Sequence, residues 1–160
     1  MTKKKPAFPL TSFTVIVDSR EQTPSDLGEL KSEVGTLCTG DYSIKGLEDF
    51  IRIERKSLQD LIGCVGRERS RFERELCRLR GFNHRAILVE SNWEDIYEGK
   101  WRGKITPKHV THSLARWALD GIPIMMCGHR PYSCQMLQRM LYLCAKQYYN
   151  ITKCFNSKEK

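Results

Sequence analysis

Residues 40–61 read GDYSIKGLEDFIRIERKSLQDL and contain a pattern typical of a β-hairpin. One strand is predicted within residues 35–44 and a second within residues 49–57, joined by the turn region at Lys45-Gly46. Because side chains alternate between the two faces of a strand, Glu54 projects to the same face as Lys56, two residues further on. The stretch therefore predicts a hairpin that gathers charged side chains at one end.

Acidic side chains converge on this hairpin. Asp41 lies near the end of the first strand, so pairing of the two strands can bring its carboxylate beside that of Glu54. Two converging carboxylates repel each other unless a cation lies between them, and their hard oxygen atoms suit Mg²⁺ or Mn²⁺. Such an ion can activate water for attack on a phosphodiester, and Lys56 can stabilise the developing charge. Asp18 is the last residue of the strand FTVIVD, and Glu21 lies just beyond it. Both can add metal ligands if that strand lies next to the hairpin in the sheet.

The rest of the chain alternates between strand and helix patterns. Further strands are predicted in FTVIVDSRE, RAILVE and GIPIMMCGH, which begin at residues 13, 85 and 121. Helices are predicted within residues 57–82, 106–120 and 131–150, with a short helix in the loop 23–35. Gly63 and Gly66 are expected to break or bend the first of the long helices. The order indicates an α/β domain with a mixed central sheet flanked by helices.

Composition limits the possible partners. The 160 residues suffice for one domain, and 40% of them are hydrophobic. Lys and Arg number 27 against 19 Asp and Glu, a net charge of +8, which fits either a phosphate-rich partner or a generally basic protein. No apolar run has membrane-spanning length and no secretory signal is recognisable, so we expect an intracellular protein, in the cytoplasm or nucleoid or in the nucleus, without a membrane partner. The seven cysteines lack CxxC spacing and are expected to be buried, reduced thiols.

The order VDSRE, TGDYSI and IERKSLQDL resembles the nuclease domain of the XPF family of structure-specific endonucleases. The signature of that family is Gly-Asp, a variable gap, Glu-Arg-Lys, three residues and Asp, and Gly40-Asp41, Glu54-Arg55-Lys56 and Asp60 match it. The similarity extends over about residues 13–148. It implies a restriction-endonuclease-like core and Mg²⁺- or Mn²⁺-dependent cleavage. It also implies branched DNA as substrate, such as flaps, forks or single-strand/duplex junctions, in DNA repair, recombination or replication.

The resemblance assigns roles by matched position. The implied catalytic set is Asp18, Asp41, Glu54 and Lys56, with the three acids as metal ligands and with Glu21, Arg55 and Asp60 in support. For Asp60 a structural role near the start of the following helix is an equal alternative. Two further alternatives for the whole chain stay open. One is a DNA-binding module of the same fold with weak catalysis, and the other is a Holliday-junction resolvase or restriction-type nuclease.

The expected domain organisation is simple. Residues 1–10 are predicted to form a flexible basic arm, residues 11–150 a single nuclease domain and residues 151–160 a frayed tail. The sequence shows neither a helicase region nor a C-terminal tandem helix-hairpin-helix module, so it resembles a small stand-alone form of the family. A helicase or a DNA-binding protein acting in trans is therefore a conceivable partner.

Two helical patterns suggest surfaces for partners. The spacing of four arginines predicts one stripe on a helix that could follow a DNA backbone: Arg67, Arg71, Arg74 and Arg78. The alternative is a solvated face on which neighbouring glutamates pair with them. The last helix carries an apolar stripe, Met136, Leu137, Met140, Leu141 and Cys144, which favours core packing first and a homodimer contact second. His109 and His112 lack a third ligand and are expected on an ordinary helix face.

Overall fold

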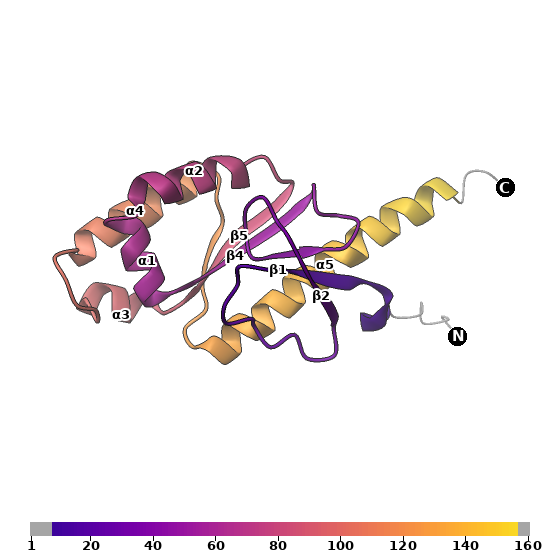
Figure 1. The fold of residues 1–160 in the computed structure, drawn as a ribbon, viewed down its shortest axis with the longest axis horizontal. Coiled ribbons are helices and arrows are strands. Elements are labelled where there is room, and N and C mark those ends of the chain that lie inside the picture. Colours follow the sequence, from indigo (N-terminus) through magenta and orange to yellow (C-terminus); the bar gives the residue numbers. More distant parts are fainter. Residues whose placement is uncertain (1–7, 157–160) are drawn as a thin grey trace, which may run out of the picture.

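A mixed β-sheet forms the centre of the computed structural model, which describes residues 8–156 (Figure 1). Within those residues the sheet has six strands in the order β2-β1-β3-β4-β5-β6. Their bounds are β1 Thr14–Asp18, β2 Lys31–Gly35, β3 Tyr42–Ile44, β4 Ile51–Ser57, β5 His84–Glu90 and β6 Ile124–Met126. β3 runs antiparallel to both β1 and β4, whereas the other neighbours are parallel. The predicted mixed sheet and hairpin are therefore confirmed.

Helices cover both faces of this sheet. A 3₁₀ turn, Leu10–Ser12, precedes β1, and the helices are α1 Leu58–Val65, α2 Arg69–Leu79, α3 Trp93–Glu98, α4 Pro107–Leu119 and α5 Arg130–Asn156. The expected start of the 106–120 helix is confirmed, since Thr106 is the N-cap of α4 and Pro107 its first residue. α5 runs along the sheet and its C-terminal part projects beyond it (Figure 1).

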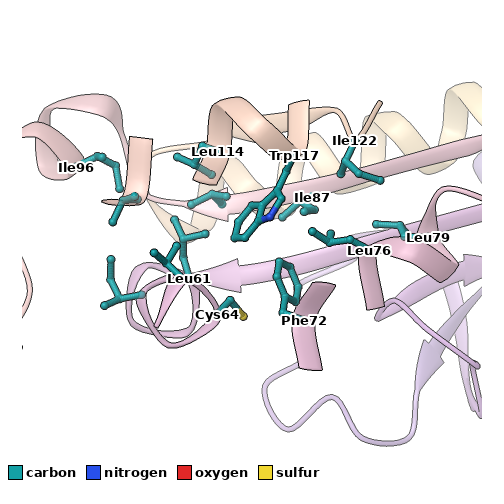
Figure 2. Packing of buried hydrophobic residues seen from close by; sticks show 14 residues of the cluster. Leu61, Cys64, Phe72, Leu76, Leu79, Ile87, Ile96, Leu114, Trp117 and Ile122 are labelled. Atoms are coloured by element: carbon teal, nitrogen blue, oxygen red, sulfur yellow. The ribbon is translucent and has the colours of Figure 1, made fainter. Parts of the chain in front are cut away.

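The alternation of side chains divides the core into two clusters. Ile87 and Val89 of β5 pack beneath α1, α2 and α4, where Phe72 and Trp117 meet edge to face with ring centroids 5.1 Å apart (Figure 2). Leu88 points to the other face, which α5 covers. In the apolar stripe on α5, Leu137 and Leu141 belong to this second cluster, and Met136, Met140 and Cys144 pack against it. The stripe therefore packs in the core, as expected first from the sequence.

Two predictions about secondary structure are wrong. Residues 31–35 form the edge strand β2, and not part of a loop with a helix. Because β2 is almost wholly exposed, no burial pattern in the sequence marks it as a strand. Its hydrogen bonding to β1 alone makes it one. The last helix continues to Asn156, so residues 151–156 are helical and not a frayed tail. Residues 1–7, which hold most of the predicted basic arm, and residues 157–160 lie outside the described part of the chain.

The predicted break in the helix of residues 57–82 is confirmed. α1 ends at Val65 and α2 begins at Arg69, with Gly66 between them. A Cβ atom at Gly66 would lie 3.2 Å from Cδ1 of Ile105, which is tighter than ordinary contact. The break therefore packs closely against the segment that leads into α4.

The cysteine and membrane expectations have mixed outcomes. Cys64 and Cys134 are buried as expected, but Cys38, Cys77 and Cys154 are exposed, so the prediction of buried thiols is wrong for those three. Within residues 8–156, no helix has both the length and the apolar character needed to cross a membrane.

The glycine before Asp41 is required by the backbone, and its replacement should be costly. Gly40 has a φ of 74°, and an added Cβ would lie 3.2 Å from Cδ of Arg52. Gly40→Ala is therefore expected to lower the free energy of unfolding by about 1–3 kcal/mol, measured by urea denaturation. Gly46→Ala is the matched control, since Gly46 has a φ of 80° but no heavy atom within 4 Å of the added Cβ. Equal losses in the two variants would contradict the packing part of this explanation.

Candidate active site

The hairpin brings Asp41 and Glu54 to one face of the sheet. Tyr42 of β3 lies opposite Ile53 of β4, and both side chains pack in the cluster beneath α5. Their sequence neighbours Asp41 and Glu54 therefore turn to the opposite face. The backbone N–H of Asp41 donates a 2.9 Å hydrogen bond to the carbonyl of Ile53, which fixes the end of the hairpin. The convergence expected from the sequence is thus present.

Burial gives these two acids unusual electrostatics. Loss of solvent raises the pKa of Glu54 to about 7, and the nearby charge of Asp41 contributes in the same direction. Burial likewise raises the pKa of Asp41 to about 6, although the backbone N–H of Arg55 and the charge of Lys56 oppose the shift. Both carboxylates would therefore be more stable in the ionised form if more positive charge lay beside them.

Lys56 supplies part of that charge. Its ammonium forms an ion pair with Oε1 of Glu54 and lies 5.3 Å from the ring centroid of Phe72, a residue of α2. Burial alone would lower the pKa of Lys56, but Glu54 and Asp41 raise it above its ordinary value, so the side chain carries a proton at neutral pH. The predicted projection of Glu54 and Lys56 to one face is confirmed.

Two carboxylate oxygens at this site remain available. Oδ2 of Asp41 accepts a 2.7 Å hydrogen bond from the N–H of Arg55, and Oε1 of Glu54 is held by Lys56. In residues 8–156, Oδ1 of Asp41 and Oε2 of Glu54 accept no hydrogen bond, and no set of three Asp, Glu, His or Cys side chains is placed to hold a metal ion. Carboxylate oxygens are the ligands that divalent cations prefer, so these two oxygens are the candidates for holding one.

Asp18 is placed differently from the other predicted ligands. Its carboxylate accepts hydrogen bonds from Nε of Arg20 at 2.7 Å, from the N–H of Arg20 at 2.9 Å and from the N–H of Leu37 at 2.7 Å. Burial raises the pKa of Asp18, but these donors outweigh it and hold the pKa below its ordinary value. The structure therefore engages Asp18 in joining the end of β1 to the loop before β3, and it does not complete a ligand set with Asp41 and Glu54.

The predicted supporting residues Glu21 and Arg55 form a buried network on the other side of β4. The Arg55 guanidinium contacts Glu21 at 3.2 Å, Glu90 at 2.9 Å and the Thr23 hydroxyl at 2.6 Å. The side chains of Arg55, Glu21 and Glu90 are only 7%, 7% and 9% exposed. Glu90 was not predicted from the sequence, although this residue ends β5 just as Asp18 ends β1.

Asp60 takes part in the capping of α1. The Ser57 hydroxyl accepts a 3.1 Å hydrogen bond from the N–H of Asp60 and donates a 2.6 Å bond to its carboxylate. The geometry therefore shows the structural role for Asp60, at the start of α1, that was one of its two predicted roles. His109 has a comparable function in α4, where its Nδ1 accepts a 3.2 Å hydrogen bond from the N–H of the N-cap Thr106.

The predicted arginine stripe is only partly formed. Arg67 lies in the connection before α2, so it does not continue the helical row of Arg71, Arg74 and Arg78, which are exposed. Arg71 forms an ion pair with Glu68 and lies 3.8 Å from Oε2 of Glu75. For Arg71 the structure therefore shows pairing with neighbouring glutamates, which was the alternative to contact with a DNA backbone.

Glu75 of α2 is a further acid near the site that was not among the site residues predicted from the sequence. Its side chain is 18% exposed, Oε2 is buried without a hydrogen bond, and its charge helps to raise the pKa of Glu54. Its signal in the sequence is weak, because Glu75 is one of three glutamates on a helix rich in arginine.

Comparison of the sequence with known protein families identifies the class of protein to which the chain belongs. The model of the ERCC4 domain matches residues 17–140. The chain therefore belongs to the ERCC4 domain family, which makes it a nuclease that acts on DNA. No sequence among curated proteins matches it significantly.

Solved structures share the fold. XPF from Aeropyrum pernix superposes with a TM-score of 0.67 at 21% identity, over 88% of this chain and 69% of that one. XPF from Aeropyrum pernix in complex with DNA gives a TM-score of 0.65 at 23% identity, over 84% of this chain and 66% of that one. The chain thus spans about two thirds of either protein, and the restriction-endonuclease-like fold is confirmed.

Proposed function

We propose that the chain is a divalent-metal-dependent endonuclease that hydrolyses phosphodiester bonds in branched DNA. The observation that carries this proposal is the pair formed by the half-buried Asp41 and the buried Glu54, each with one oxygen free and with Lys56 bound to Glu54. Burying two like charges together is unfavourable unless a cation compensates them, so the pair has a physical reason to exist if Mg²⁺ or Mn²⁺ binds there.

The residues present fit such an ion. Asp41 and Glu54 would hold it through the two free oxygens, and carboxylate oxygen is the ligand that these hard cations prefer. When bound, the ion supplies positive charge that polarises a phosphoryl oxygen and increases the acidity of water. Asp18, which already has its own donors, would contribute by fixing the loop that leads to Asp41.

Lys56 would act on the substrate directly. Its ammonium is held in place by Glu54 and by contact with Phe72, so little conformational freedom remains to be lost when a phosphate binds. Because its pKa is raised, it stays charged at neutral pH and can stabilise the negative charge that develops on the phosphate oxygens.

Branched DNA is the proposed substrate because of the family signature and the charge of the protein. Gly40-Asp41, Glu54-Arg55-Lys56 and Asp60 match the signature of structure-specific endonucleases, and the net charge of +8 suits a polyanion. A related fold has been solved in complex with DNA, as the XPF protein from Aeropyrum pernix.

Cleavage of a panel of labelled DNAs tests this proposal. We expect flap and fork DNA to be cut with Mg²⁺ or Mn²⁺, and the plain duplex to be cut at least about tenfold more slowly, since an open junction offers unpaired strands without unstacking a duplex. EDTA should stop the reaction. A preference for four-way junctions would point to a resolvase, equal cutting of duplex to a restriction-type enzyme, and binding without cutting in either metal to a DNA-binding module.

A further inference from the structure

A cavity opens beside the candidate active site. It has a volume of about 520 Å³ and lies between α1, the α1–α2 connection and the segment before α4. Lys56 contributes to its wall, so the cavity adjoins the ammonium that binds Glu54. Its other charged lining residues are Asp60, Arg67, Glu68, Arg71 and Arg102.

The break between α1 and α2 creates this cavity. Gly66 packs closely on Ile105, since a Cβ atom added at Gly66 would lie 3.2 Å from Cδ1 of Ile105. The close contact brings the segment containing Arg102 to the same cavity as Arg67, although the two residues are far apart in the sequence. An unbroken helix would not produce this arrangement.

The positive charges in the cavity are unequally compensated. Arg71 forms an ion pair with Glu68, and the largely exposed Arg67 lies 3.6 Å from the same carboxylate. Lys56 is paired with Glu54. Within residues 8–156, by contrast, Arg102 forms no ion pair or hydrogen bond. It is therefore a guanidinium available for an external anion, at a cavity that begins at Lys56.

We propose that this cavity binds a phosphodiester of the substrate next to the one that is cleaved, with Arg102 as a positioning residue. The inference rests on the proposed nuclease function and deepens it by giving the DNA strand a path. A guanidinium matches phosphate oxygens through two parallel hydrogen bonds, and the cavity is within the size range of small-ligand sites. The DNA strand would pass from Asp41 and Glu54 along Lys56 and past the α1–α2 break. It would not follow α2 outward to Arg74 and Arg78.

Binding of labelled flap DNA in EDTA, at several salt concentrations, tests the inference without cleavage. Arg102→Ala should weaken binding about five- to tenfold at low salt and reduce the slope of log K against log salt concentration by about 1. Lys104→Ala is the matched control, since Lys104 is exposed in the same segment but does not line the cavity. It should leave the slope within about 0.3 of that of the wild type.

The outcomes separate this inference from the proposed function. Equal effects of the two substitutions, or no effect of either, would overturn the assignment of Arg102 even if the wild type cuts DNA with Mg²⁺. Absence of metal-dependent cutting by the wild type would instead contradict the function. Melting temperatures check folding, and both variants should melt near the wild type because Arg102 and Lys104 have no protein partner in residues 8–156.

Discussion

Asp41→Asn should abolish DNA cleavage and at the same time leave the metal-free protein as stable as the wild type or more stable. The substitution removes a carboxylate oxygen that the metal ion would use, and we expect cleavage of flap DNA to fall by at least about 10²-fold. It also removes the half-buried negative charge beside Glu54, while the amide oxygen of Asn can still accept the hydrogen bond from the N–H of Arg55. Relief of about 1 kcal/mol would raise the melting temperature by roughly 2–4 °C in EDTA.

Metal binding gives the same experiment a second readout. Mg²⁺ at about 100 times its dissociation constant should stabilise the wild type by about 2.7 kcal/mol, because it binds only the folded chain, and should not stabilise Asp41→Asn. Asp49→Asn is the control, since Asp49 is exposed in the same hairpin. Loss of cleavage together with an unchanged Mg²⁺-dependent melting shift would show that Asp41 is not a ligand, and unimpaired cleavage would place the active site elsewhere.

The hairpin could be predicted because its signals are local. Alternation along FIRIERK fixes which side chains share a face, and the pairing of two neighbouring strands needs only a short turn. Both inferences survive in the structure, where Lys56 binds Glu54 and Arg55 points the other way. Gly63 and Gly66 likewise predicted a helix break, because glycine is a poor helix former, and the break lies at Gly66.

The remaining features depend on contacts between distant segments. Two partners of Asp18 and Arg55 come from segments that only the sheet order brings close: the backbone N–H of Leu37 binds Asp18, and the carboxylate of Glu90 binds Arg55. The sequence does not state that order. β2 was missed because an exposed edge strand has no burial pattern. The cavity could not be predicted either, because it requires the segment before α4 to meet the α1–α2 connection.

Arg55→Met is expected to be the most destabilising single substitution discussed for this protein. The guanidinium is 7% exposed and joins Glu21, before β2, to Glu90 at the end of β5, and its contacts to these acids are 3.2 Å and 2.9 Å long. Burial raises the pKa of Glu21, but Arg55 outweighs it and holds that pKa below its ordinary value, so the carboxylate is ionised at neutral pH. Met fills a similar volume but leaves Glu21 buried without its cation, and it leaves Glu90 with the more distant Arg130, at 3.7 Å.

Breaking such a buried network from one side costs about 3–5 kcal/mol, which corresponds to a fall in melting temperature of roughly 10 °C for a chain of this size. The triple variant Arg55→Met, Glu21→Gln, Glu90→Gln removes the uncompensated charges and should recover most of that loss. Thermal and urea unfolding of the single and triple variants measure both values. A loss below about 1 kcal/mol in the single variant, or a triple variant no more stable than the single one, would mean that solvent reaches Glu21 and Glu90 and that the network does not hold these strands together.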